Sequence, residues 1–175
     1  AVLGDSFCWG LGVREKDHFL TIADAELAQQ GVRAELYNFG IPGYTTANEI
    51  ALYNQVVRRF HPDVCVIWYV LNDIGVGSRL GTIGRLGGDD MAVALRKHLY
   101  LADLVIEPID RAVNSRHLIR EYKAAYTPGS ARLEGLEQNL RMFAMLCQRN
   151  GTKPLLVIHP ILYRLDRDYP FHEAH

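Results

Sequence analysis

A serine, Ser6, follows a short apolar run and a Gly-Asp pair at the beginning of the chain, which reads AVLGDSFCWG. A small polar residue at that position either caps the next segment or acts as a nucleophile. By itself, Gly-Asp-Ser is common in turns and helix caps. The choice therefore depends on which other polar groups the fold brings to the same place.

Polar groups and loop amides also follow three later segments that are expected to be strands. In chain order these are Asn38-Phe-Gly-Ile-Pro-Gly43 after 32–38, Asn72-Asp73 after 64–71, and His159-Pro160 after 155–159. Each has an ordinary explanation as turn chemistry, and a glycine-rich loop before a helix can also bind phosphate. Together with Ser6, however, they supply a hydroxyl nucleophile and amide donors for an oxyanion. Acyl transfer needs these groups.

Apolar periodicity predicts that helices alternate with these strands. The expected strands are 1–3, 32–38, 64–71 and 155–159, and the expected helices are 17–30, 46–60 and 131–149. This order predicts an α/β fold, a flavodoxin-like three-layer α/β/α arrangement with a parallel sheet. The carboxyl ends of such strands share one edge, and ligands bind beyond that edge. We therefore expect Ser6, the 38–43 loop and Asn72 to lie together.

Two details of this prediction concern individual elements. The spacing of Thr46-Ala-Asn-Glu49 is that of a capping box, so a helix is expected to start there, with an apolar stripe that ends at Phe60. The segment 64–71 is apolar throughout, which predicts a strand buried on both faces.

The three motifs resemble sequence blocks of the SGNH (GDSL-type) hydrolases. Leu3-Gly-Asp-Ser-Phe7 is similar to the first block, Asn38–Gly43 to the second and Leu71-Asn-Asp73 to the third, in the family's order. The resemblance covers nearly the whole chain. In one departure, Leu71 stands where the third block often has glycine, two residues before its Asp.

The resemblance implies a serine esterase that acts on a small acyl ester, carried by a carbohydrate or a lipid, through an acyl-enzyme. Ser6 would be the nucleophile, and its own N–H would be the first oxyanion donor. Gly43 would add a backbone N–H and Asn72 a side-chain amide, while Asp5 would shape the turn. This mechanism needs no cofactor, and no metal is implied.

The base that a serine nucleophile needs is not found among these motifs. The family takes it from an Asp-x-x-His block, and the nearest match, Asp168 to His172, is one residue too long. We expect the chain to be truncated at both ends, with a fifth strand and this block beyond His175. Two alternatives stay open: His159 is the base, or the chain is a non-catalytic relative that binds an ester or glycan.

Residues 1–175 are expected to form a single domain, with 74–130 as a helical insertion or lid beside the site. Transfer of the acyl group to another hydroxyl, as in an O-acyltransferase, would use the same residues. An unrelated flavodoxin-like nucleotide or flavin binder is a further alternative, supported by the strand order and the glycine-rich second loop.

Composition narrows the class of partner. The net charge is −1, from 19 basic and 20 acidic residues, which disfavours nucleic acid as a partner. No apolar run approaches the ~20 residues of a transmembrane helix. The three cysteines lie far apart in the sequence and are expected to be buried free thiols: Cys8, Cys65 and Cys147. The compartment and the oligomeric state stay open.

Overall fold

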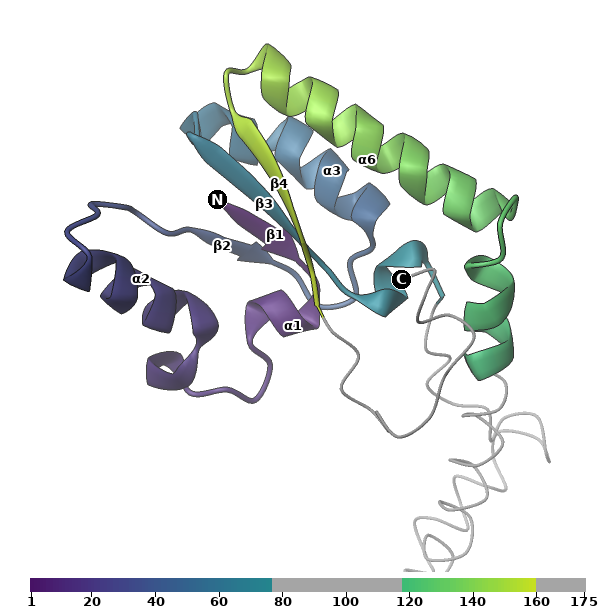
Figure 1. The fold of residues 1–175 in the computed structure, drawn as a ribbon, viewed down its shortest axis with the longest axis horizontal. Helices are drawn as coiled ribbons and strands as arrows, with labels where there is room; N and C mark the ends of the chain where they lie inside the picture. Colours follow the sequence, from purple (N-terminus) through teal and green to yellow (C-terminus); the bar gives the residue numbers. More distant parts are fainter. Residues whose placement is uncertain (77–117, 160–175) are drawn as a thin grey trace, which may run out of the picture.

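Four parallel strands form the sheet in the computed structural model, which describes residues 1–76 and 118–159 (Figure 1). The strands are β1 (Val2–Gly4), β2 (Asn38–Gly40), β3 (Val64–Tyr69) and β4 (Lys153–Ile158). Their order across the sheet is β2-β1-β3-β4. The chain moves from β1 to one side and then returns to the other, so the strand order reverses between β1 and β3. Open α/β sheets bind ligands at such a switch point.

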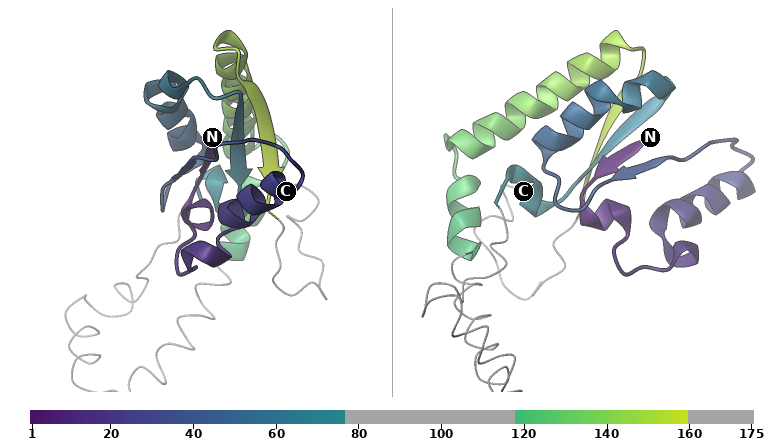
Figure 2. Two further views of the ribbon diagram at one scale, coloured as in Figure 1. Left: turned by 90° about the vertical axis from the view of Figure 1, so that its left-hand side faces the viewer. Right: turned by 180° about the vertical axis from the view of Figure 1, so that it is seen from behind.

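The helices cover the two faces of the sheet unequally. On one face lie α3 (Thr46–Gln55), a 3-10 turn η2 (Val57–Phe60) and α6 (Ala131–Arg149), while α2 (Phe19–Gln29) lies on the other (Figure 2). Right-handed crossovers require this division, because β1 and β2 are connected in the opposite direction from β3 and β4. The described part of the chain is therefore an α/β fold with a parallel sheet, as predicted.

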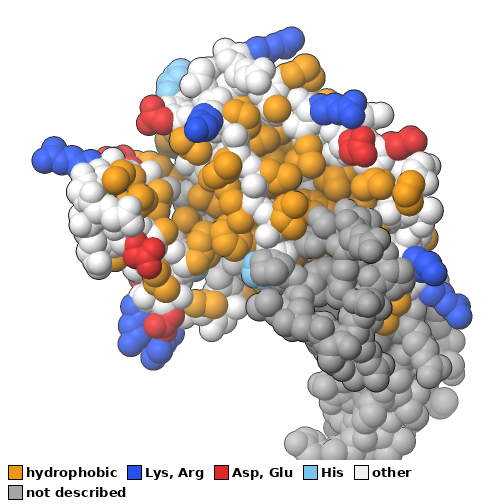
Figure 3. Space-filling model, in the orientation of Figure 1, with side chains coloured by type: hydrophobic (Ala, Val, Ile, Leu, Met, Phe, Trp, Pro, Cys, Tyr) orange, Lys and Arg blue, Asp and Glu red, His pale blue; other side chains and the backbone are white. Residues whose placement is uncertain are grey.

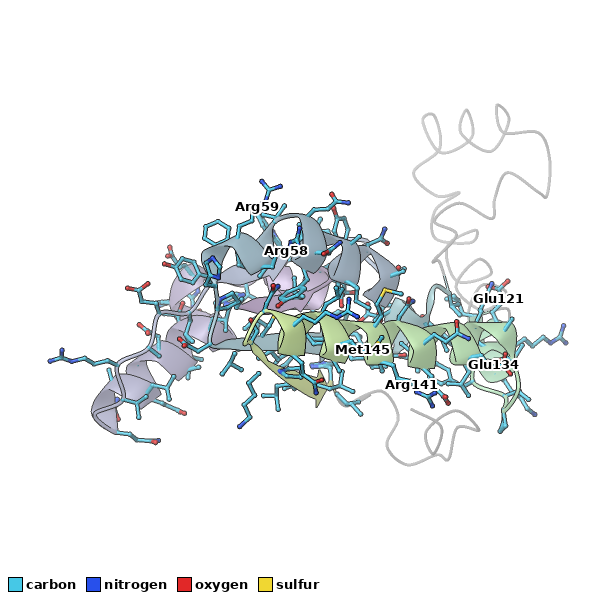
Figure 4. The ribbon with its side chains drawn as sticks, turned by 90° about the horizontal axis from the view of Figure 1, so that it is seen from above. Arg58, Arg59, Glu121, Glu134, Arg141 and Met145 are labelled. Atoms are coloured by element: carbon cyan, nitrogen blue, oxygen red, sulfur yellow. The ribbon has the colours of Figure 1, made fainter. Side chains whose placement is uncertain are left out.

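The longest helix, α6, shows how the sequence determines one of these layers. Ser130 caps it by accepting a hydrogen bond from the Leu133 N–H, at 3.2 Å. Leu136, Phe143 and Cys147 recur at helical spacing and are buried against the core. Figure 4 shows Arg141 and Met145 on the outer side of the same helix, where both are exposed. The predicted helix and its buried face are confirmed.

The opposite face of the sheet is only partly covered. Phe19, at the start of α2, packs against Trp68 of β3 in a tilted arrangement with ring centroids 4.4 Å apart, but no residue of α2 is itself buried. Val64 and Leu155, from β3 and β4, keep 39% and 47% of their surfaces exposed. Hydrophobic side chains consequently gather across the middle of the face seen in Figure 3.

This partial cover corrects the prediction for 64–71. Burial alternates along β3: Cys65, Ile67 and Tyr69 are buried towards α3 and α6, whereas Val66 and Trp68 are half-buried. A strand covered on one face alternates in this way. The prediction that this strand is buried on both faces was wrong for the described residues.

The second strand is shorter than predicted. It spans Asn38–Gly40 rather than 32–38, and residues 32–37 form no strand. It pairs with β1, with Val2 opposite Asn38 and Gly4 opposite Gly40.

The third helix also differs from its predicted bounds. Thr45, not Thr46, is the N-cap, and Asn48 returns the capping contact through its side chain, which accepts from the Thr45 N–H at 3.2 Å. The helix ends at Gln55, and the tighter η2 turn breaks the 3.6-residue period. Phe60 therefore faces outward, 61% exposed, and packs on Phe39 with the ring centroids 5.8 Å apart.

Four further expectations concern the long insertion, the C-terminal Asp and His, the cysteines and membrane-spanning helices. Within 74–130, residues 77–117 lie outside the described residues. The structure describes 74–76 and 118–130, where a helix at 118–125 leads by a turn into α6. The candidate Asp168 and His172 also lie outside the described residues. All three cysteines are buried and free. Within 1–76 and 118–159, no helix is both long and apolar enough to cross a membrane.

Candidate active site

Ser6 is the first residue of a short helix, α1 (Ser6–Trp9), that begins where β1 ends. Asp5 is the N-cap of this helix and accepts a hydrogen bond from the Phe7 N–H at 2.9 Å. Because Asp5 supplies the cap, the hydroxyl of Ser6 is not needed for it. The sequence alone left the choice between cap and nucleophile open, and this geometry removes the cap explanation for Ser6.

Two glycines allow α1 to lie directly on the edge of the sheet. A Cβ on Gly4 would lie 2.5 Å from the Cβ of Cys8, and a Cβ on Gly40 would lie 2.5 Å from the Trp9 backbone nitrogen. Gly4 and Gly40 face each other across β1 and β2. Only glycine at both positions permits this close approach.

Asn72 reaches the same corner from β3. Its Nδ2 donates a hydrogen bond to Asp5 Oδ2 at 2.8 Å, and the Ser6 hydroxyl lies 3.5 Å from the same oxygen. The first and third motifs, 67 residues apart in sequence, therefore meet at one carboxylate. Nδ2 has two hydrogens, so one remains available for another acceptor.

The turn that carries Asn72, η3 (Leu71–Ile74), is fixed from behind by two contacts. Asp73 Oδ2 accepts from the Val70 N–H at 2.6 Å. The buried Tyr126 hydroxyl, next to the 118–125 helix, donates to the Leu71 carbonyl at 3.0 Å. The side-chain amide of Asn72 is thus held by Asp5 on one side, while hydrogen bonds from Val70 and Tyr126 hold its turn on the other.

Gly43 lies in a tight turn between β2 and α3. The Tyr44 N–H donates to the Ile41 carbonyl at 3.1 Å, which closes a four-residue turn with Pro42 and Gly43 at its centre. Gly43 has φ of +83°, as the third residue of a type II turn requires. The Ile41 N–H in turn donates to the Gly4 carbonyl at 2.9 Å, so this turn is attached next to Asp5.

We expect Gly43→Ala to lower the free energy of unfolding by about 1–2 kcal/mol, because its φ is positive although its surroundings are open. Urea denaturation would measure this change. Gly135→Ala is the matched control: that glycine lies within α6, has open surroundings and is expected to stabilise by about 0.5–1 kcal/mol. Equal effects at the two glycines would contradict the argument.

His159 follows β4 on the same edge of the sheet. Its N–H donates to the Tyr69 carbonyl at 2.8 Å, and its ring lies 5.2 Å from that of Phe7, the neighbour of Ser6. Among the described residues, no hydrogen bond joins His159 to Ser6, and the buried His159 Nδ1 has no partner. Its role as a base stays a prediction, as do the roles of Ser6, Gly43 and Asn72.

Two buried carboxyl groups lie beneath this edge, and the sequence motifs did not single out either of them for chemistry. Burial raises the pKa of Glu49 to about 9, and the nearby Asp73 and Asp5 raise it further. Burial likewise raises the pKa of Asp73 to about 8, against the lowering effect of the Val70 N–H. Both carboxyls are therefore mainly protonated at pH 7. The buried helix position of Glu49 was the signal that could have identified it.

These raised pKa values predict a pH-dependent stability. In the unfolded chain Glu49 ionises near the ordinary glutamate pKa of 4.5, whereas in the folded chain it keeps its proton to about 9. Over this window the unfolded state binds fewer protons, so stability falls as pH rises, by about 1.4 kcal/mol per pH unit for this group.

Glu49→Gln is expected to remove this contribution. Relative to the parent, the variant's free energy of unfolding should increase by about 1.4 kcal/mol for each pH unit between about 5 and 9. Urea denaturation at pH 5, 7 and 9 would measure it, with the exposed Glu26→Gln as control. A difference that does not change with pH would show that Glu49 ionises normally.

No group of three or more His, Cys, Asp or Glu side chains that could hold a metal occurs within 1–76 and 118–159. The site is formed instead by a serine hydroxyl, amide groups and one carboxylate.

Comparison of the sequence with known families shows to which family the chain belongs. The sequence profile of the GDSL-like lipase/acylhydrolase family matches residues 2–162. The chain belongs to this family. The family is one of hydrolases of the ester-cleaving type, and the match spans the segments that carry Ser6, Gly43 and Asn72.

The fold of this GDSL-like chain is also similar to a solved structure, that of TesA, with a TM-score of 0.56 and 21% sequence identity. The likeness covers 99% of this chain and 66% of the TesA chain, so the chain spans about two thirds of that protein's length. At this identity the likeness concerns the fold. No curated protein sequence matches the chain.

Proposed function

We propose that this chain is the core of a serine acyl hydrolase that cleaves small acyl esters through an acyl-enzyme. Ser6 attacks the carbonyl carbon, and the ester oxygen leaves with a proton. Water then releases the acid and restores Ser6. The Ser6 and Gly43 backbone N–H groups and the Asn72 amide stabilise the oxyanion of each tetrahedral intermediate.

The observation that carries this proposal is the contact of Asn72 Nδ2 with Asp5 Oδ2 at 2.8 Å, next to the Ser6 hydroxyl. It holds an amide donor beside a serine that no helix cap requires. Membership of the acylhydrolase family supports the same chemistry.

A second candidate function is binding of an ester or glycan without cleavage. It is favoured by one observation, that Ser6 has no histidine partner among the described residues. Under this second function the protein has no base for Ser6. Under the first function, His159 or a residue outside the described ranges supplies it.

A fluorophosphonate probe tests the proposal directly, because it reacts with activated serines. The 175-residue chain and the product of the gene read to its own stop codon would both be treated, and the attachment site mapped by peptide mass. Labelling at Ser6 in either form supports catalysis. Labelling of the 175-residue chain by itself would make His159→Asn the next variant. Failure of both forms would favour the binding function.

A further inference from the structure

The helix at 118–125, which precedes α6, ends beside the η3 turn that carries Asn72 (Figure 1). The residue that follows this helix, Tyr126, is 3% exposed and lies in the hydrophobic core. Its hydroxyl donates to the Leu71 carbonyl at 3.0 Å and lies 2.5 Å from the Tyr69 hydroxyl. A side chain 55 residues after Leu71 therefore contacts both the end of β3 and the beginning of η3.

These two hydrogen bonds have a defined direction. A carbonyl oxygen only accepts, so the single hydroxyl hydrogen of Tyr126 points to Leu71. The Tyr69 hydroxyl is then the donor in the bond between the two tyrosines. Burial raises the pKa of both hydroxyls, so both keep their hydrogens at neutral pH. Donation by Tyr69 polarises the Tyr126 hydroxyl and strengthens its bond to the carbonyl.

The Leu71 carbonyl matters because it belongs to the peptide group that leads into Asn72. A peptide group is planar, so the direction of this carbonyl also fixes the direction of the bond from the Asn72 nitrogen to its Cα. At the other end of the same residue, Asn72 Nδ2 donates to Asp5 Oδ2 at 2.8 Å. Tyr126 thus holds the main-chain end of Asn72, and Asp5 holds the amide end.

Tyr126 is itself held by the connection between the helix at 118–125 and α6. Its N–H donates to the Tyr122 carbonyl at 2.9 Å. Ser130 joins the two helices, because its hydroxyl donates to the Ala125 carbonyl and its side chain also caps α6. The Tyr126 hydroxyl is therefore a fixed anchor for η3 that comes from the layer of helices and not from the sheet.

We propose that Tyr126 is a positioning residue for Asn72 in the proposed ester hydrolysis. Through the Leu71 carbonyl it keeps the Asn72 amide directed at the oxyanion that forms when Ser6 attacks. This inference rests on the proposed function, because it needs Asn72 to act as an oxyanion donor. Such a donor acts on charge that develops only in the transition state, so a displaced amide lowers kcat and leaves KM nearly constant.

Two matched variants isolate the contact with Leu71, and each deletes one buried hydroxyl. Tyr126→Phe removes both hydrogen bonds, whereas Tyr69→Phe removes only the bond between the two tyrosines. In steady-state kinetics on an aryl ester with the gene product read to its own stop codon, Tyr126→Phe should lower kcat about tenfold, with KM within about twofold of the parent's. Tyr69→Phe should lower kcat by no more than about threefold, because the bond to the carbonyl is weakened but kept.

A double variant separates positioning from a general loss of structure. In the Asn72→Ala background, Tyr126→Phe should lower kcat no further, because the amide that it positions is already gone. A purely structural role would instead lower kcat by the same factor in both backgrounds, and that result would contradict the proposal.

The side-chain amide signals of Asn72 give a readout that does not need catalysis. They are identified in ¹H–¹⁵N spectra by their loss in Asn72→Ala. These signals should move in Tyr126→Phe and stay nearly unchanged in Tyr69→Phe.

p-Aminophenylalanine in place of Tyr126 keeps the test available if Tyr126→Phe fails to fold. Its amino group still donates to the Leu71 carbonyl, but it is a weaker donor than a phenol. We expect kcat to fall about threefold, and the Asn72 amide signals to move in the same direction as in Tyr126→Phe but less far.

Two further results would overturn the proposal. Equal effects of Tyr126→Phe and Tyr69→Phe on kcat would show that the contact with Leu71 has no special role. Unmoved Asn72 signals in both Tyr126 variants would show that this contact does not direct the amide. Failure of the proposed function has a different signature, because hydrolysis would then survive Ser6→Ala, whatever the effect of the tyrosine variants.

Discussion

Replacing Ser6 by alanine is expected to abolish ester hydrolysis, lowering kcat/KM for a simple aryl ester by about 10⁴-fold or more. In the proposed mechanism this hydroxyl is the attacking group that forms the acyl-enzyme. The measurement is release of the aryl alcohol by the gene product read to its own stop codon, together with loss of fluorophosphonate labelling.

The structure makes Ser6→Ala an informative variant, because the fold does not use this hydroxyl. Asp5 caps α1, and the hydroxyl's one contact among the described residues is a long 3.5 Å approach to that same carboxylate. The melting temperature should therefore stay within a few degrees of the parent's. Hydrolysis at the parent's rate would exclude Ser6 as the nucleophile.

Asn72→Ala is expected to lower kcat by about 10²–10³-fold with little change in KM. Removal of a single oxyanion donor typically has this effect, since the donor acts on charge that develops only in the transition state. Steady-state kinetics on the same aryl ester would separate kcat from KM. Asn54→Ala, at an exposed position of α3, is the matched control and should have no effect.

Asp5 offers a second test of the same geometry. Asp5→Asn can keep one acceptor oxygen, for either the Phe7 N–H or the Asn72 amide, but not both. We expect a smaller loss of kcat than for Asn72→Ala, with KM again nearly constant. If Asn72→Ala instead raised KM and left kcat unchanged, Asn72 would be a substrate-binding residue and not an oxyanion donor.

The sheet and its order of helices could be predicted from the sequence because apolar periodicity reports which residues face a core. The buried positions of α6 show this, since Leu136, Phe143 and Cys147 recur at helical spacing. Local bounds were less predictable, because they depend on partners elsewhere in the chain. The bounds of β2 follow its pairing with β1, in which Val2 lies opposite Asn38 and Gly4 opposite Gly40, and Phe60 faces outward because η2 interrupts the helical period.

For the site, the sequence indicated residue types and their edge of the sheet, but not their contacts. The capping box was predicted at Thr46–Glu49 but joins Thr45 and Asn48, and this shift matters because Glu49 is then free to lie in the core. The hydrogen bond between Asp5 and Asn72 spans 67 residues, and no local pattern reports such a contact. Raised pKa values depend on burial and on neighbouring charges, so they required the fold.

The paired glycines beneath α1 have a consequence for how this scaffold can diversify. Because Gly4 and Gly40 carry no Cβ, Cys8 and Trp9 of α1 lie directly against the two strands, and this contact fixes the height of Ser6 above the sheet. Loops that select a substrate can therefore change in length and composition while Ser6 keeps its position. Substrate preference can then vary independently of the proposed nucleophile.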